Sequence, residues 1–110
     1  MGNFSISIEN DGQEGRYVAR ADGIDEEAEI TFTRHGPRLI SADHTNAPEA
    51  LRGTGIAAAL VDHLVADARR RGIRVLPACP YIQARYAKHP EWSDVFTVGP
   101  GEEPVIGAES

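Results

Sequence analysis

The sequence predicts an α/β fold of the α+β kind, built on one mixed sheet. The expected order is antiparallel N-terminal strands, a strand–loop–helix–strand crossover and a short C-terminal helix. Three observations lead to this prediction. Apolar and polar residues alternate with period two in the N-terminal segments, as in strands with one buried face. An apolar stripe with helical spacing follows, and a short apolar run after it predicts a strand parallel to the one before the helix.

Four strands are expected before the helix, at residues 4–9, 16–20, 28–33 and 38–44. Turn residues separate them, such as Asn-Asp-Gly at 10–12 and Ala-Asp-Gly at 21–23. Short turns of this kind favour antiparallel pairing of consecutive strands, which makes a meander. The acidic stretch 22–27 is expected to be a solvated loop.

One amphipathic helix is expected at residues 56–71. Its apolar stripe, which should face the sheet, consists of Ile56, Leu60, Val61, Leu64, Val65 and Ala68. Asp62, Asp67 and the arginines of this segment are expected to face water. Three arginines at 69–71 suit the negative end of the helix dipole, and Gly72 can adopt the left-handed cap that ends a helix.

The C-terminal part should contain a parallel strand at 73–79, a short helix at 80–88 and a last strand within 91–98. Pro77 lacks a backbone N–H, so the two parallel strands are expected to separate there. The Pro80 position suits a helix start, and Pro90 disfavours helix at the residue before it. We expect residues 1–98 to form a single domain and residues 99–110 to be a flexible tail.

Composition narrows the function classes. The chain of 110 residues fits one domain, and its formal net charge of −6 argues against a nucleic-acid partner. Cys79 is the single cysteine, so no internal disulfide can form. The sequence starts without a signal-peptide pattern and has no apolar run of the roughly 20 residues that span a bilayer. A cytoplasmic protein without a membrane partner is expected, as a monomer or homodimer.

The loop at residues 52–57 (Arg-Gly-Thr-Gly-Ile-Ala) is the strongest candidate for a ligand site. Glycine lets the backbone take positive φ, and the first N–H groups of the following helix have no partner within it. These donors, the helix dipole and Arg52 together favour an anion such as phosphate. The alternative is a tight strand-to-helix turn without a ligand, because the loop matches neither the Walker pattern nor the dinucleotide fingerprint.

The pattern Arg52-x-x-Gly55-x-Ala57 resembles the Arg/Gln-x-x-Gly-x-Gly/Ala signature of the GNAT superfamily of N-acetyltransferases. The wider resemblance is to its minimal single-domain members, described as YjdJ-like or N-acetyltransferase-domain-containing proteins. It is carried by His-Thr at 44–45, Pro-Glu at 48–49, the loop at 52–57, Pro-Ala-Cys-Pro-Tyr at 77–81 and His-Pro-Glu at 89–91.

The resemblance implies acetyl-coenzyme A (acetyl-CoA) as the cofactor, with its pantetheine arm lying between the two separating parallel strands. The implied cofactor-binding residues are Thr45, Arg52, Gly53, Thr54, Gly55, Ile56 and Ala57. The short connections between the first strands imply that the helices usual there are absent or reduced. The acceptor side of the site would then be open.

The candidate catalytic residues are His44, Cys79 and Tyr81. His44 is either a general base or a residue that hydrogen-bonds the loop backbone. Cys79 is either an acetyl carrier or a small buried side chain, the second being preferred. The resemblance implies that a tyrosine protonates the leaving thiolate, and this is Tyr81 or alternatively Tyr86. Weaker candidates are Glu49 as a base and His89, which alternatively caps a helix end. No metal site is expected.

The expected function is acetyl-CoA-dependent N-acetyl transfer, directly from the thioester to a primary amine of a small molecule or a lysine side chain. The alternative is a non-catalytic module that binds coenzyme A or an acyl-CoA for sensing or partner regulation. A third reading is an interaction domain whose glycine turn binds nothing. The sequence does not name the acceptor, because function follows the site rather than the fold.

Overall fold

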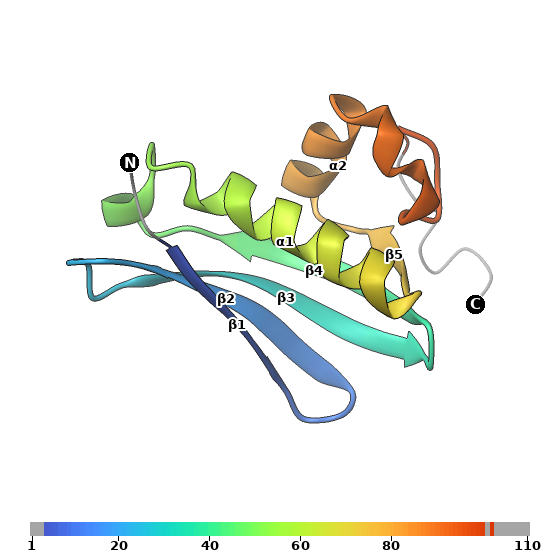
Figure 1. The fold of residues 1–110 in the computed structure, drawn as a ribbon, viewed down its shortest axis with the longest axis horizontal. Helices are drawn as coiled ribbons and strands as arrows, with labels where there is room; N and C mark the ends of the chain where they lie inside the picture. Colours follow the sequence, from blue (N-terminus) through green and yellow to red (C-terminus); the bar gives the residue numbers. More distant parts are fainter. Residues whose placement is uncertain (1–3, 101, 103–110) are drawn as a thin grey trace.

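A five-stranded sheet in the order β1-β2-β3-β4-β5 carries both α-helices on one face (Figure 1). The computed structural model describes residues 4–100 and 102. The strands are β1 (Phe4–Asn10), β2 (Glu14–Ala21), β3 (Glu27–Gly36), β4 (Leu39–Asn46) and β5 (Arg74–Pro77). The helices are α1 (Ile56–Arg71) and α2 (Pro80–Ala87), with 3-10 turns η1 (Glu49–Leu51) and η2 (Pro90–Asp94).

The pairing of the strands confirms the predicted topology. β1 to β4 form an antiparallel meander, and β4 pairs with β5 in parallel. Because β4 and β5 run in the same direction, the chain must cross from one end of the sheet to the other between them. The helix α1 makes this crossing. Its start therefore lies at the end of β4, where the glycine loop was predicted.

The apolar stripe predicted for α1 packs against the sheet. Ile56, Leu60, Val61, Leu64, Val65 and Ala68 are all buried, together with apolar residues of β2, β3, β4 and α2. Gly72 ends the helix at φ 70°, and its N–H donates to the carbonyl oxygens of Ala68 and Arg69. This is the left-handed cap expected from the sequence.

The expectation that Asp67 faces water is wrong. The residue is only 2% exposed, and Tyr17 of β2 donates its hydroxyl hydrogen to Asp67 Oδ2 at 2.8 Å. Position 67 follows Leu64 by three residues, so it shares the buried face of the helix. Arg70 and Arg71 pair with its other oxygen, Oδ1, and the buried charge is compensated.

The predicted C-terminal strand at 91–98 is also wrong. The chain forms η2 instead, and β structure there is limited to a single bridge between Val75 and Phe96. Pro90 begins this turn, and prolines are suited to the first position of a helix. Trp92, Val95 and Phe96 are buried at spacings of three and four, which a helical turn places on one side.

Within residues 4–100 and 102, the second face of the sheet has no helix over it, as Figure 1 shows, because each of the first four strands connects directly to the next. This agrees with the short connections read from the sequence. Val18 lies between the core residues Tyr17 and Ala19, so its side chain points to the second face, where it is nevertheless only 1% exposed. Arg16 of the same strand pairs with Glu9, Glu27 and Glu29 of the neighbouring strands. The open face is thus polar and covered by ion pairs.

Most of the predicted tail falls on residues 101 and 103–110, which lie outside the described residues, so the tail stays a prediction, as does the domain boundary at residue 98. Among residues 4–100 and 102, no helix is long and apolar enough to cross a membrane.

Candidate active site

A cavity of about 490 Å³ lies beside the glycine loop. Its walls come from the end of β4, from the loop, from the first turn of α1 and from Tyr81 of α2. All of the residues predicted to bind the cofactor line it except Thr54: Thr45, Arg52, Gly53, Gly55, Ile56 and Ala57. Residues that are separate in the sequence therefore meet in one hollow.

The loop presents its backbone in a form that suits an anion. Gly53 has φ 80° and Gly55, the N-cap of α1, has φ 85°, both in the left-handed region that only glycine adopts readily. The Thr54 hydroxyl donates to Leu51 O at 2.5 Å and also accepts a 3.3 Å bond from Ile56 N. The first turn of α1 contains no acidic residue. Negative charge is therefore favoured there by the helix dipole and by exposed Arg52.

The two parallel strands separate where the sequence predicted. Their pairing runs from Leu39 and Arg74 as far as Ala42 and Pro77, and there it ends. Ala42 O then accepts hydrogen bonds from the N–H groups of both Ala78 and Cys79, each at 3.1 Å. Thr45, further along β4, has no backbone partner on β5. A split thus opens between the strands next to the glycine loop.

A β-bulge in β4 determines which residues face each side of this split. Thr31 of β3 pairs with His44, whereas the next residue, Phe32, pairs with Ala42, so Asp43 is an extra residue. The bulge places both Asp43 and His44 on the face opposite α1, and both line a cavity there. Thr45 follows on the α1 side and lines the loop cavity. Consecutive residues of β4 therefore reach different faces of the sheet.

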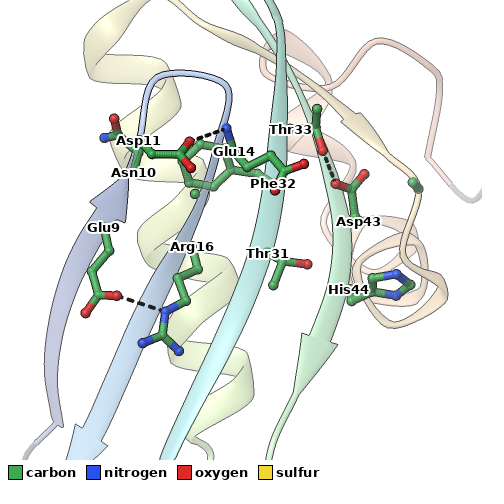
Figure 2. A pocket seen from close by; sticks show the side chains of 12 residues that line it. Glu9, Asn10, Asp11, Glu14, Arg16, Thr31, Phe32, Thr33, Asp43 and His44 are labelled. Carbon is green, nitrogen blue, oxygen red and sulfur yellow. Dashed lines mark hydrogen bonds and ion pairs between the residues drawn. The ribbon is translucent and has the colours of Figure 1, made fainter.

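The cavity on the open face has a volume of about 820 Å³ (Figure 2). Asp43 is held in it by two hydroxyl groups: Thr33 donates to Oδ2 at 2.6 Å and Ser41 to Oδ1 at 2.7 Å. Ser41 is buried, and its oxygen lies 2.8 Å from Nε2 of His35. Because the Ser41 hydrogen goes to Asp43, the imidazole nitrogen is the donor in this contact. This chain of hydrogen bonds fixes a carboxylate beside the split.

Cys79 and Tyr81 lie on the α1 side of the split. Cys79 is the N-cap of α2, is 5% exposed and donates its thiol hydrogen to Thr45 Oγ1 at 3.3 Å. Tyr81 is exposed and borders the loop cavity. His44 projects from the other face, so the three catalytic candidates approach the split from two sides. The structure places Cys79 beside Thr45 and separates both from the His44 side chain.

A protein-family model described as GCN5-related N-acetyl-transferase matches residues 16–95, which include the glycine loop, the split and every residue that lines the loop cavity. The chain belongs to this acetyltransferase family. Protein NATD1 of Bos taurus is 28% identical over 85 residues, covering 77% of this chain and 75% of the relative. NATD1 of Homo sapiens is 27% identical with the same two coverages. The solution structure of a GCN5-like protein from Staphylococcus aureus matches the fold with a TM-score of 0.57, at 19% identity and over 93% of both chains.

Other candidates lie away from the split of this GCN5-related domain. Tyr86 is fully buried and donates its hydroxyl to Val98 O at 2.6 Å, and burial raises its pKa. His89 stacks on Trp92 with ring centroids 4.4 Å apart and pairs with Glu91 at 3.0 Å. These contacts give Tyr86 and His89 structural roles. Glu49 begins η1 and lines neither cavity.

Asp43 is the residue of this GCN5-related site that sequence reasoning missed, together with its partners Thr33 and Ser41. The spacing Ser41-x-Asp43 within a strand was a usable signal, because alternate residues share a face. The bulge that brings His44 to the same face has no marker in the sequence. Among the described residues, no three His, Cys, Asp or Glu side chains gather in a way that would hold a metal ion.

Proposed function

We propose that the chain is an acetyl-CoA-dependent N-acetyltransferase that moves the acetyl group directly to a primary amine, on a small molecule or a lysine side chain. The observation that carries this proposal is the arrangement of two cavities on opposite faces of the sheet, which meet β4 at His44 and Thr45. One cavity suits an anionic cofactor, and the other has room for an acceptor. A cytoplasmic location and a monomeric or homodimeric state belong to the same proposal.

The residues of the loop cavity fit the anionic end of acetyl-CoA. The N–H groups at the start of α1 and the guanidinium of Arg52 supply donors for a pyrophosphate. Because Gly53 and Gly55 carry no side chain, a ligand can approach their backbone closely. Thr45 and Tyr81 border the same cavity nearer the split, where the acyl end would lie.

When bound, acetyl-CoA supplies a thioester whose carbonyl carbon a neutral amine can attack, forming a C–N bond as the C–S bond breaks. An alkylammonium ion must first lose a proton, and His44 is the proposed acceptor of that proton on the amine side. The leaving thiolate takes a proton, for which Tyr81 is the proposed donor on the cofactor side, and the second proton that the nitrogen loses as the amide forms restores Tyr81 through water. The buried thiol of Cys79, directed to Thr45, supports direct transfer rather than an acetyl-cysteine intermediate.

A binding module without turnover is the second candidate, and the openness of the acceptor face favours it. No α-helix of the described part of the chain covers the larger cavity, so water has access to the place where an amine would react. Many enzymes close their sites during the reaction to exclude water. This candidate predicts cofactor binding without release of thiol.

Calorimetry with acetyl-CoA tests the cofactor site. Arg52→Ala and Gly55→Ala are expected to weaken binding at least about tenfold, since each removes roughly 1.4 kcal/mol or more of anion recognition or loop geometry. Matched controls are Arg38→Ala, which removes an exposed arginine elsewhere, and Gly23→Ala, which strains a glycine at φ 82° in another turn. Equal loss in the control variants, or no binding by the wild type, would overturn the cofactor assignment.

Release of free thiol with a panel of amines then separates the enzyme from the module. We expect Tyr81→Phe to lower kcat by about tenfold to a hundredfold, in line with the loss of a general acid, while acetyl-CoA affinity changes little. Cys79→Ala should retain turnover, because direct transfer does not need its thiol. A complete loss in Cys79→Ala with an intact fold would instead support an acetyl-cysteine intermediate.

A further inference from the structure

The larger cavity lies on the open face, over β1 to β4, and most of the residues that line it are polar (Figure 2). Four carboxylates and one arginine line it: Glu9, Asp11, Glu14, Asp43 and Arg16. It extends from the turn between β1 and β2 to Ala78 at the split. The cavity thus runs from an acidic turn to the point where the acetyl group is proposed to lie.

Arg16 does not neutralise this lining. Its Nε pairs with Glu9 at 2.9 Å, and its terminal nitrogens pair with Glu29 at 2.6 Å and Glu27 at 3.5 Å. These carboxylates, Glu29 first, raise the pKa of Arg16, which therefore stays charged and engaged. One cation is shared among three anions. The arginine adds no net positive charge to the cavity.

The other three carboxylates have no cationic partner among the described residues. Asp43 accepts hydrogens from two neutral hydroxyl groups, and Asp11 Oδ1 accepts from the backbone N–H groups of Gln13 and Glu14. The Glu14 side chain makes no such contact, and Figure 2 shows it running from β2 across β3. Negative charge therefore stands at both ends of the cavity, at Asp43 and at the β1–β2 turn.

Thr31 gives an independent indication of a ligand. Its Oγ1 is buried and has no hydrogen-bond partner within the described residues, although the residue lines the cavity. Buried polar atoms in proteins are nearly always hydrogen-bonded, to protein, water or ligand. Thr31 lies opposite Arg16 on one side and His44 on the other, in the middle of the face. A water or a polar ligand group that reached this hydroxyl from the cavity would satisfy it.

We propose that this cavity is the acceptor site and that its acceptor is an aliphatic primary amine with a second positive charge at its other end. The inference rests on the proposed function and adds the substrate class. The reacting nitrogen lies against Asp43 and His44 beside the split, and the second charge lies against Asp11 and Glu14. An amine with one charge leaves the second acidic position unpaired and binds less well.

Thiol-release kinetics with 1,4-diaminobutane and with n-butylamine provide the test. For the wild type, kcat/KM is expected to be at least about tenfold higher for the diamine, which corresponds to roughly 1.4 kcal/mol of additional recognition. Glu14→Gln keeps the shape of the side chain and removes its charge. It should reduce kcat/KM for the diamine about fivefold to tenfold and reduce the value for n-butylamine clearly less.

The matched control is Glu26→Gln, which removes an exposed carboxylate at the β2–β3 turn outside the cavity. It should leave both rates unchanged. Acetyl-CoA affinity and melting temperature are measured for each variant, so that loss of the cofactor site or of the fold is recognised separately. Equal rates for the two amines, or an equal effect of Glu14→Gln on both, overturns the acceptor proposal while cofactor binding and turnover still stand.

An NMR titration supports the same test if turnover is slow with every amine. With coenzyme A present, 1,4-diaminobutane is expected to shift the backbone amide signals of Glu14, Thr31 and Asp43. The Glu14→Gln variant should need about fivefold more diamine for the same shift. Shifts confined to residues outside the cavity, or none up to millimolar diamine, would contradict the proposal whatever the kinetics show.

Discussion

The buried hydrogen bond between Tyr17 and Asp67 should contribute measurably to stability, because it joins α1 to the sheet. The tyrosine is 4% exposed, and its hydroxyl donates to the carboxylate at 2.8 Å. A hydrogen bond to a charged acceptor contributes about 1.5–3 kcal/mol. Since Asp67 keeps Arg70 and Arg71 as partners, we expect Tyr17→Phe to cost about 1.5–2 kcal/mol, the low end of this range. In a domain of this size that lowers Tm by roughly 6–8 °C.

A double-mutant cycle isolates this interaction. The unfolding free energies of Tyr17→Phe, Asp67→Ala and the double variant are measured by urea denaturation. Removing Asp67 leaves the buried Tyr17 hydroxyl unpaired, and removing that hydroxyl leaves Asp67 Oδ2 without its donor. The double variant should therefore lose about 1–2 kcal/mol less stability than the sum of the two single variants. Tyr81→Phe, at an exposed tyrosine, is the control and should leave stability unchanged. Additivity within about 0.5 kcal/mol would refute the reasoning.

The pH dependence of stability checks the same contact. Burial, and secondly the hydrogen bond to Asp67, raises the pKa of Tyr17 above that of a free tyrosine. The folded state therefore holds this proton more tightly than the unfolded state. The stabilisation is fully present below the unfolded pKa of about 10 and is lost as the pH rises toward the higher folded pKa. The stability difference between wild type and Tyr17→Phe should shrink above about pH 10, and a constant difference would contradict this account.

Four further substitutions test the packing and the C-terminal cap of α1, each by urea denaturation. Leu60→Ala removes a fully buried side chain and should cost about 2–5 kcal/mol; a smaller loss would show that the core is loosely packed. At Gly15 an added Cβ would lie 2.5 Å from Phe32 Cζ, so Gly15→Ala should cost about 1–3 kcal/mol. Gly36→Ala meets nothing within 4 Å and should stay within about 0.5 kcal/mol; equal losses at the two glycines would contradict the packing around Phe32. Gly72→Ala puts an alanine in the left-handed conformation at φ 70° and should lower the free energy of unfolding by about 1–2 kcal/mol. No loss would show that another residue caps α1.

Up to residue 88, the sequence by itself determined the strands and α-helices and their order, because these depend on local periodicity and turn chemistry. Alternation marked the strands of the meander, four-residue spacing marked the apolar stripe of α1, and Pro77 marked the point where β4 and β5 separate. The glycines at 53 and 55 indicated the backbone conformation of the loop, since glycine adopts positive φ readily whatever its surroundings.

Only the tertiary structure decided which side chains face which cavity. The bulge at Asp43 depends on how β4 pairs with β3, and this pairing moved His44 to the open face, away from the loop cavity. Asp67 is buried because Tyr17, distant in sequence, supplies a partner for its carboxylate. Residues 90–94 form a helical turn rather than a strand, and the buried Phe96 that follows stacks on Tyr86 of α2, a contact between segments that the sequence did not indicate. Local propensity sets the elements, whereas contacts between distant segments place the residues of the site.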